Sequence, residues 1–240
     1  MEHGESREKY ETPEEAMEAC LDSLENIEEV ETSQIEAIIE LAEARIFEIF
    51  EPQIKDKYRR VIQALRTRSA KNLQTVAPVG SGIILPREHV ITDQDRNEIV
   101  MTVTTHEISN LSDMTLLSEV DRNSVDRQNS RGYLILIGER DHSCWINLKL
   151  FKLKFKDGSE KTFLYIADRY VALPRRGKKI GEALLGLADE TALDNRSSLI
   201  FAKLIPENPA ELPYLVKGHE KAGYRISREQ DLVVAKKDFQ

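Results

Sequence analysis

The spacing of apolar positions along the chain changes from a helical repeat to a strand-like repeat near residue 97. In the first 75 residues apolar side chains recur every three or four positions, which places them on one face of a helix. We therefore expect three amphipathic helices, with the apolar residues Met17, Cys20, Leu21, Leu24 and Ile27, then Ile35, Ile38, Ile39, Ala42, Ile46, Ile49 and Phe50, then Ile54, Tyr58, Val61, Ile62 and Leu65.

Helix-start signals accompany this repeat. Thr12 is a predicted N-cap, followed by Pro13 at the first helical position and by Glu15, which would close a capping box. A second start is expected at Ser33, three residues before Glu36, and Pro52 should end that helix before a third begins near residue 53.

Beyond residue 97 the pattern predicts a sheet. Residues 98–105 are rich in β-branched side chains, and 132–139, 144–156 and 161–173 read as three consecutive strands of an antiparallel meander. A helix is then expected over 180–195, a strand over 198–205, a helix over 210–222 and short strands over 224–226 and 232–236, with a further short helix over 112–120. The predicted fold class is α/β (α+β), with a mixed, mostly antiparallel sheet flanked by helices and a helical N-terminal extension.

Glycine and proline cluster at 78–86, which indicates a linker. The expected organisation is a helical extension over 1–75, a linker over 76–96 and a second domain over 97–240.

Charge divides the chain in the same way. The total of −8 is the sum of −14 over 1–51, where 17 acidic residues face 3 basic ones, +6 over 52–75 and zero over 76–240. Opposite charges favour a hairpin of the second and third helices, and the extension is expected either to bind a partner or a second copy, or to cover the main domain. The neutral C-terminal body and the low aromatic content of 6% argue against nucleic-acid binding.

No membrane span or secretory signal is expected, and two distant cysteines, Cys20 and Cys144, indicate neither a disulfide nor a zinc site. Each is read as a small buried apolar residue, and a reducing cytoplasm is the expected location. His142 near Cys144 has no second ligand pair, so no metal site is expected.

A basic loop over 172–181 carries the strongest functional signal, because it joins a predicted strand to an apolar helix. Backbone N–H groups at a helix N-terminus attract anions, Gly177 and Gly181 let an anion approach the main chain, and Arg175, Arg176, Lys178 and Lys179 add positive charge. The spacing matches neither a P-loop nor G-x-G-x-x-G.

This loop resembles the acyl-CoA-binding motif of the GNAT superfamily of N-acyltransferases, which reads roughly V-x-P-x-x-R-G-x-G-x-G. The stretch from Val171 to Gly181 carries the likeness, and His219-Glu-Lys-Ala-Gly-Tyr224 is similar to the family's Y-E-K-x-G-F ending. The likeness covers about residues 97–240, including the order of elements, so it implies a GNAT-like fold and transfer of an acetyl group from acetyl-CoA to an amine.

The resemblance implies roles for particular residues. The pantetheine arm of acetyl-CoA would lie along Val171, Ala172 and Leu173, and the remaining cofactor-binding residues would be Arg176, Gly177, Lys178, Lys179, Ile180, Gly181 and Asn208. Asp168 is the expected base for the acceptor amine, on a strand face shared with Ile166 and Tyr170. The departing thiolate would take its proton from His219 or Tyr214, which lie 140° apart on a regular helix and so do not share a face.

Two departures from the motif support a second hypothesis. Lys179 stands where the motif has its central glycine, and His219 stands where many members have tyrosine. A non-catalytic GNAT-like module that binds CoA, or that acts through its N-terminal helices, is therefore the alternative.

Overall fold

The computed structural model describes residues 10–72, 88–108, 111, 120–121, 123–206, 209–229 and 232–239. The chain divides into two compact units, residues 1–74 and 75–240. Each unit has its own hydrophobic core.

The N-terminal unit consists of helices α1 (Pro13–Asp22), α2 (Ile35–Ile46) and α3 (Pro52–Asn72), with 3₁₀ segments at Leu24–Glu29 and Thr32–Gln34. The apolar stripes predicted from the sequence meet in one core, in which Met17, Ile38 and Leu65 are fully buried. An ion pair of 2.5 Å between Arg66 of α3 and Glu43 of α2 joins the two oppositely charged segments.

The ends of these helices follow the sequence signals in part. Thr12 caps α1 by accepting a hydrogen bond from the Glu15 N–H at 3.2 Å, as predicted, whereas the Glu15 carboxylate accepts from the Glu11 N–H. The cap predicted at Ser33 is wrong: α2 begins at Ile35 after a 3₁₀ turn and has no side-chain cap. Pro52 is the first residue of α3, where its missing N–H costs no helical hydrogen bond.

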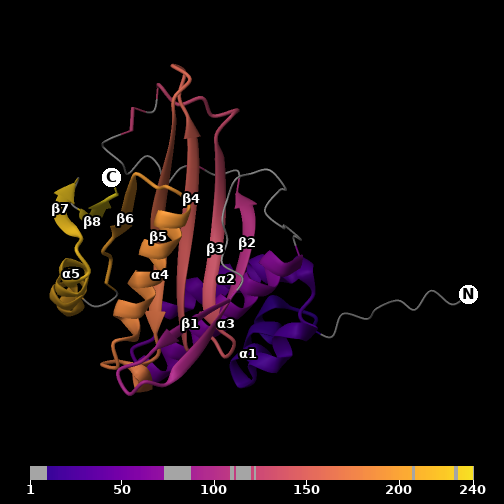
Figure 1. The fold of residues 1–240 in the computed structure, drawn as a ribbon. Coiled ribbons are helices and arrows are strands. Elements are labelled where there is room, and N and C mark those ends of the chain that lie inside the picture. The colour runs from indigo at the N-terminus through magenta and orange to yellow at the C-terminus, as the bar shows by residue number, and fades with distance from the viewer. Residues whose placement is uncertain are drawn as a thin grey trace, which may run out of the picture. The chain divides into compact units, whose positions relative to one another are not determined.

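The C-terminal unit is built on one eight-stranded sheet in the order β1-β2-β3-β4-β5-β6-β8-β7 (Figure 1). The strands are β1 (Glu88–Thr92), β2 (Glu98–Ile108), β3 (Arg131–Glu139), β4 (Cys144–Lys154), β5 (Glu160–Val171), β6 (Leu199–Lys203), β7 (Arg225–Glu229) and β8 (Leu232–Asp238). Every neighbouring pair is antiparallel except β5 and β6, which run parallel. The predicted mixed, mostly antiparallel sheet with helices is confirmed.

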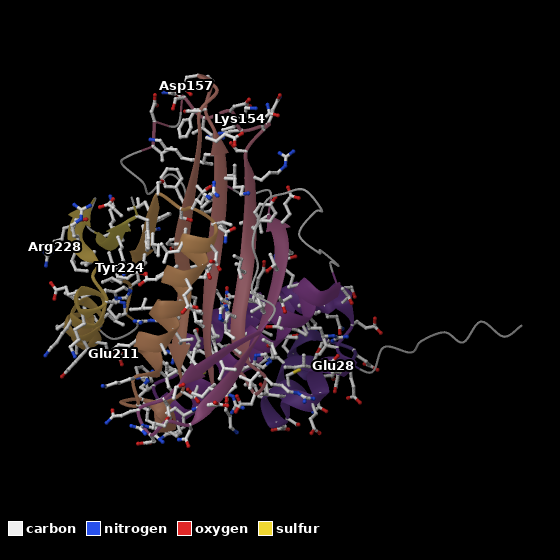
Figure 2. The ribbon with its side chains drawn as sticks, in the orientation of Figure 1. Glu28, Lys154, Asp157, Glu211, Tyr224 and Arg228 are labelled. Atoms are coloured by element: carbon white, nitrogen blue, oxygen red, sulfur yellow. The ribbon has the colours of Figure 1, made fainter. Side chains whose placement is uncertain are left out.

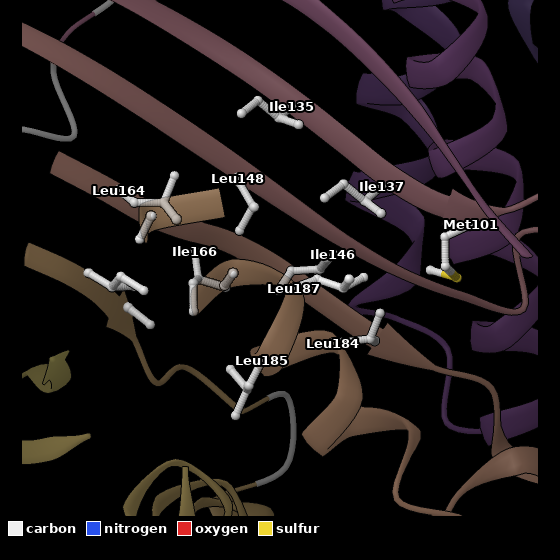
Figure 3. Close-up of a cluster of buried hydrophobic side chains, with 14 of the residues drawn as sticks. Met101, Ile135, Ile137, Ile146, Leu148, Leu164, Ile166, Leu184, Leu185 and Leu187 are labelled. Atoms are coloured by element: carbon white, nitrogen blue, oxygen red, sulfur yellow. The ribbon is translucent and has the colours of Figure 1, made fainter. Parts of the chain in front are cut away.

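Helix α4 (Ile180–Asp194) packs on one face of the sheet, and α5 (Leu212–Lys221) lies near its β6–β8–β7 end (Figure 1). Figure 3 shows the main core, where side chains of β2 to β5 meet those of α4, among them Leu148, Leu164, Ile166 and Leu184. A smaller cluster containing Phe151, Phe163 and Phe201 lies on the opposite face. Burying both faces explains why β3 reads as a nearly continuous apolar run.

The β4–β5 hairpin turns at Asp157-Gly158, as predicted, and Gly158 has φ +86°, which suits glycine. Figure 2 shows Lys154 and Asp157 at this tip of the long strands. Both cysteines are free and buried, as expected, and burial raises the pKa of Cys20 to about 11 and that of Cys144 to about 12.

The range predicted as a linker, 76–96, contains the edge strand β1, so the linker prediction is wrong for residues 88–92. Exposure alternates from His89 to Thr92, with Ile91 5% exposed and Val90 55% exposed, and the strand pairs with β2 through a turn in which Asp93 accepts from the Asp95 and Asn97 N–H groups. So short an alternation is weak evidence for a strand when polar residues surround it. The predicted linker core at 78–86 and the helix predicted over 112–120 lie, apart from Val120, outside the described residues.

Candidate functional site

The candidate site begins at the point along β5 beyond which β6 no longer pairs with it. Residues Phe163 to Ile166 of β5 pair with Leu199 to Ala202 of β6, but β5 continues to Val171 while β6 ends at Lys203. Beyond this point the Leu204 N–H donates to Val233 of β8, which takes the chain away from β5. Among the described residues, the last third of β5 is therefore paired only with β4.

Backbone alternation identifies which groups face the open side of β5. The Ala172 N–H donates to the Ser143 carbonyl at 2.8 Å, so Ala172 turns its backbone towards the end of β4. Successive strand residues turn to opposite sides, so the N–H and C=O groups of Val171 and Arg169 face away from β4. The Ala172 N–H is therefore already used within the protein, whereas the backbone of Val171 faces the open side of β5, and their predicted contacts with pantetheine stay predictions.

A β-bulge in β5 determines which side chains lie near the open backbone groups of Arg169 and Val171. The β4–β5 register passes from Leu148 opposite Ile166 to Asn147 opposite Asp168, so Ala167 is an extra residue and the strand has a β-bulge. Ile166 belongs to the core under α4, but Asp168 turns to the other face together with Tyr170. The expectation that Ile166 shares the face of Asp168 is wrong because a bulge breaks the period of two.

Asp168 lies in an aromatic corner of the sheet. Its Oδ2 accepts a hydrogen bond of 3.0 Å from the Trp145 indole N–H across the β4–β5 pair. Trp145 stacks on Tyr170 with ring centroids 4.4 Å apart. Sequence reasoning missed Trp145, because only the bulged register brings the single tryptophan of the chain beside this carboxylate.

Three of the four cationic side chains of the loop have protein partners. Arg175 pairs with Glu139 and donates to the Ser143 hydroxyl, and Lys178 pairs with Asp95 at 3.0 Å. Arg176 donates from Nε to the Val171 carbonyl at 3.1 Å, and its Nη1 lies 3.7 Å from Glu211. These contacts fix the loop to the β3–β4 turn, the β1–β2 turn and the start of α5. The basic residues therefore hold the loop in place in addition to giving it positive charge.

The backbone of the loop, by contrast, is rich in unused donors. Gly177 and Lys179 have positive φ values, +84° and +60°, and they lead directly into α4. Within the described residues, none of the five consecutive N–H groups from Gly177 to Gly181 donates to a protein acceptor; the first N–H that does so belongs to Glu182, which donates to the Lys179 carbonyl at 3.0 Å. Left-handed residues before a helix N-terminus produce such a concave set of N–H groups, which favours an anion.

Lys179 occupies a glycine-like position. A left-handed conformation costs a residue with a side chain about 1–2 kcal/mol, which explains why the motif usually has glycine there. The Lys179 side chain is exposed, and its backbone is left-handed, a conformation that glycine adopts readily. The departure in sequence therefore leaves the N–H array intact. Ile180, the first residue of α4, is buried in the main core and anchors the helix start, while Gly181 brings the main chain close to Arg169.

His219 does not fit the role of proton donor. It is 3% exposed, and its Nδ1 lies 2.8 Å from the Leu215 carbonyl, which only accepts, so Nδ1 carries the proton. Burial, followed by the nearby positive charge of Arg169, lowers the pKa of His219 to about 4. The imidazole is neutral at pH 7 with an unprotonated Nε2, and the prediction that it protonates a thiolate is not supported.

Tyr214 and Asn208 are the remaining residues of α5 and its approach that the sequence predicted for the site. Tyr214 is 78% exposed on the opposite side of α5 from buried His219, as the 140° separation predicts. Asn208 lies outside the described residues. Tyr224, labelled in Figure 2 with Glu211, contacts His219 edge to face at 5.4 Å and donates to Asp189 at 3.2 Å.

Comparisons with known proteins place these features in context. No protein-family model matches the sequence, and no curated protein matches it significantly. Among solved structures, the chain is similar to the GNAT domain of S. lividans PAT at 15% identity and a TM-score of 0.36, over 65% of this chain and 100% of that one. It is also similar to Arabidopsis thaliana Naa50 in complex with a bisubstrate analogue, at 20% identity and a TM-score of 0.34, over 57% of this chain and 99% of that one. A third is nourseothricin acetyltransferase, at 14% identity and a TM-score of 0.29, over 68% of this chain and 95% of that one. The solved structures to which the chain is similar thus include GNAT-domain acetyltransferases.

Proposed function

We propose that the C-terminal unit is an acyl-CoA-dependent N-acyltransferase that moves an acetyl group from acetyl-CoA to a primary amine by direct transfer. The observation that carries the proposal is the row of five backbone N–H groups, Gly177 to Gly181, that donate to no acceptor among the described residues, at the end of a strand whose neighbour has turned away. A row of donors at a helix N-terminus suits a pyrophosphate, and an unpaired strand edge suits the amides of pantetheine.

The open side of β5 would hold the thioester. The N–H and C=O of Val171 face this side, and the carbonyl now accepts from Arg176, which would have to release it to an incoming amide. The Ala172 N–H is already bonded to Ser143, so the Val171 N–H is the strand donor available to a developing oxyanion.

Asp168 is the proposed base. An acceptor ammonium has an ordinary pKa near 10.4, so forming the neutral amine at pH 7 costs about 4–5 kcal/mol. The amine nitrogen then attacks the thioester carbon and its excess proton passes to the carboxylate, directly or through water, while the C–S bond breaks and the electron pair leaves on sulfur. Tyr214 is the remaining candidate for protonating that thiolate. The acceptor is a small-molecule or peptide amine.

The N-terminal unit is proposed to recruit a partner or a second copy. Its connection between α2 and α3 exposes Phe47 by 79% and Phe50 by 91%. Apolar side chains this exposed are typical of a contact surface. No helix in the described part of the chain is both long and apolar enough to cross a membrane.

Calorimetric titration with acetyl-CoA, followed by an assay of CoA release with a panel of amines, tests the proposal. The parent protein should bind acetyl-CoA at tens of micromolar or tighter, and Gly181→Glu should weaken binding at least about tenfold, because a carboxylate at the N–H row repels pyrophosphate. Gly186→Glu is the matched control, because it lies on the same helix at a position where a Cβ would have no neighbouring atom within 4 Å.

Three results would decide the outcome. Binding together with CoA release supports the enzyme, and binding without release from acetyl-CoA, even by slow hydrolysis, supports the non-catalytic module. If acetyl-CoA neither binds nor is hydrolysed, the assignment of the loop is wrong.

A further inference from the structure

Arg169 is an unusual residue to find between the sheet and α4. It follows the bulge in β5 and turns to the α4 face, opposite to Asp168, where its Nη1 donates to the Gly181 carbonyl at 2.7 Å. That carbonyl belongs to the first turn of α4, and a Cβ on Gly181 would lie 3.7 Å from the same nitrogen. The guanidinium therefore lies directly behind the last N–H of the row from Gly177 to Gly181.

In the described part of the chain, the charge of Arg169 is not balanced by an acid. Among the described residues no carboxylate forms an ion pair with it, and the Gly181 carbonyl is its only hydrogen-bond acceptor, although a guanidinium has five N–H donors. Asp189, which accepts a hydrogen bond from the Tyr224 hydroxyl, also pairs with Lys237 at 2.6 Å.

Its surroundings disfavour a cation in two ways. Burial lowers the pKa of Arg169, which means that the environment disfavours the charged form. In addition, the N-terminus of a helix has partial positive charge, so cations are favourable at the other end. The neighbouring His219 is kept neutral, partly by the charge of Arg169, and so adds no compensating group.

We infer that Arg169 is a positioning residue for the anion of the proposed acyl-CoA ligand: its partly buried charge strengthens the field of the N–H row and is balanced when a pyrophosphate group binds there. The inference rests on the proposed function and extends it to a residue outside the loop motif. A positive charge that the empty fold disfavours becomes favourable once two negative charges lie across one turn of backbone. The Arg169 charge thus lowers the stability of the ligand-free protein and raises its affinity for pyrophosphate.

A purely structural role predicts the opposite pattern. If Arg169 served only to brace α4 through the Gly181 carbonyl, its removal would destabilise the protein and leave anion affinity per folded molecule unchanged. The two roles are therefore separated by measuring stability and affinity on the same variants.

The experiment uses the full chain and compares the parent with Arg169→Met, which keeps an unbranched side chain but removes the charge, and Arg169→Lys, which keeps the charge. Arg225→Met is the control, because Arg225 is exposed and pairs with Asp238 on β8. Calorimetric titrations with CoA and with inorganic pyrophosphate measure affinity, and thermal unfolding without ligand measures stability.

We expect Arg169→Met to weaken both ligands at least about tenfold, Arg169→Lys to weaken them less and Arg225→Met to leave them unchanged. The melting temperature of ligand-free Arg169→Met should equal or exceed that of the parent. Unchanged affinity in Arg169→Met overturns the inference, and so does a fall in melting temperature of more than about 2 °C without a loss of affinity for pyrophosphate.

A measurement on the parent protein covers the case in which Arg169→Met does not fold. Pyrophosphate bound beside Arg169 should offset its charge and raise the pKa of His219, followed by NMR through the imidazole resonances. The titratable and charged groups around His219 are Arg169 and Tyr224, with Asp189 and Lys237 behind them. An unchanged titration at saturating pyrophosphate overturns the inference.

Failure of this inference is distinguishable from failure of the proposed function. If the parent binds CoA and Arg169→Met binds it equally well, the function stands and the role of Arg169 does not. If the parent binds pyrophosphate but not CoA, the proposed function fails, while the pyrophosphate titrations still test Arg169.

Discussion

The two ends of β5 are built from one strand but serve different purposes. From Phe163 to Ile166 the strand has a neighbour on each side, and its side chains are buried on both faces. From Asp168 to Val171 it has β4 alone, and it presents a carboxylate on one face, a guanidinium on the other and backbone groups on the open side. The bulge at Ala167 separates the two halves of β5. The first half, residues 163–166, packs in the core of the sheet. The second half, residues 168–171, is held in place by the first and positions polar groups whose burial would cost free energy in a fully paired sheet.

The largest effect should come from the open half. Asp168→Asn removes the proposed base but keeps an oxygen that accepts from Trp145, so the fold and CoA affinity should be retained. Turnover should fall by about 10² to 10⁴ at neutral pH. The difference should narrow as pH approaches the pKa of the acceptor amine, where less deprotonation is needed. Rate profiles from pH 6 to 10 measure this, and parallel profiles for variant and parent would remove Asp168 as the base.

Substitutions in the closed half of β5, residues 163–166, should instead lower the free energy of unfolding. Leu164 is fully buried against α4, and Leu164→Ala should lower the free energy of unfolding by about 2–5 kcal/mol through lost apolar contact and a residual cavity. Val171→Ala, at the open end, is the matched substitution and should cost less, because Val171 is only partly buried. Urea unfolding with an unchanged slope m is the measurement. Equal losses for the two variants would mean that the halves of β5 do not differ in packing.

Much of this division follows from sequence, but not the bulge that creates it. The β-branched and apolar runs between residues 98 and 236 identify β2 to β6 and β8, because each of these strands buries at least one face. Ala167 is small and stands among residues apolar on both faces, so no break in alternation marks the extra residue. Arg169 reads as a solvent-facing residue by its hydropathy, and only the packing of α4 buries it. The edge strand β1 and the uncapped start of α2 depend on tertiary contacts that outweigh weak local signals.

The open half should also make stability depend on pH, because burial and, after it, the charge of Arg169 keep His219 neutral. The pKa of His219 is lowered from 6.5 to about 4 in the folded state, so between these values the unfolded chain binds a proton that the folded chain does not. Stability should therefore fall as pH drops from 6.5 to 4, by about 3 kcal/mol from this group. His219→Phe keeps an aromatic ring against Tyr224 and cannot titrate. Denaturant midpoints from pH 4 to 7 should vary less in this variant than in the parent, and equal slopes would show that His219 titrates normally.

The smallest expected effect concerns the two left-handed residues that lead from the open end of β5 into α4. Lys179 has φ +60°, so Lys179→Gly should remove backbone strain and raise the free energy of unfolding by about 0.5–1 kcal/mol, the gain being reduced by the greater freedom of glycine in the unfolded chain. Gly177 has φ +84°, and a Cβ there would have no neighbouring atom within 4 Å, so Gly177→Ala should lower stability by a similar amount through backbone strain alone. Thermal unfolding of the two variants measures these opposite signs. A loss of stability in Lys179→Gly would mean that the Lys179 side chain contributes contacts that outweigh its strain, and the N–H row would then depend on the lysine rather than merely tolerate it.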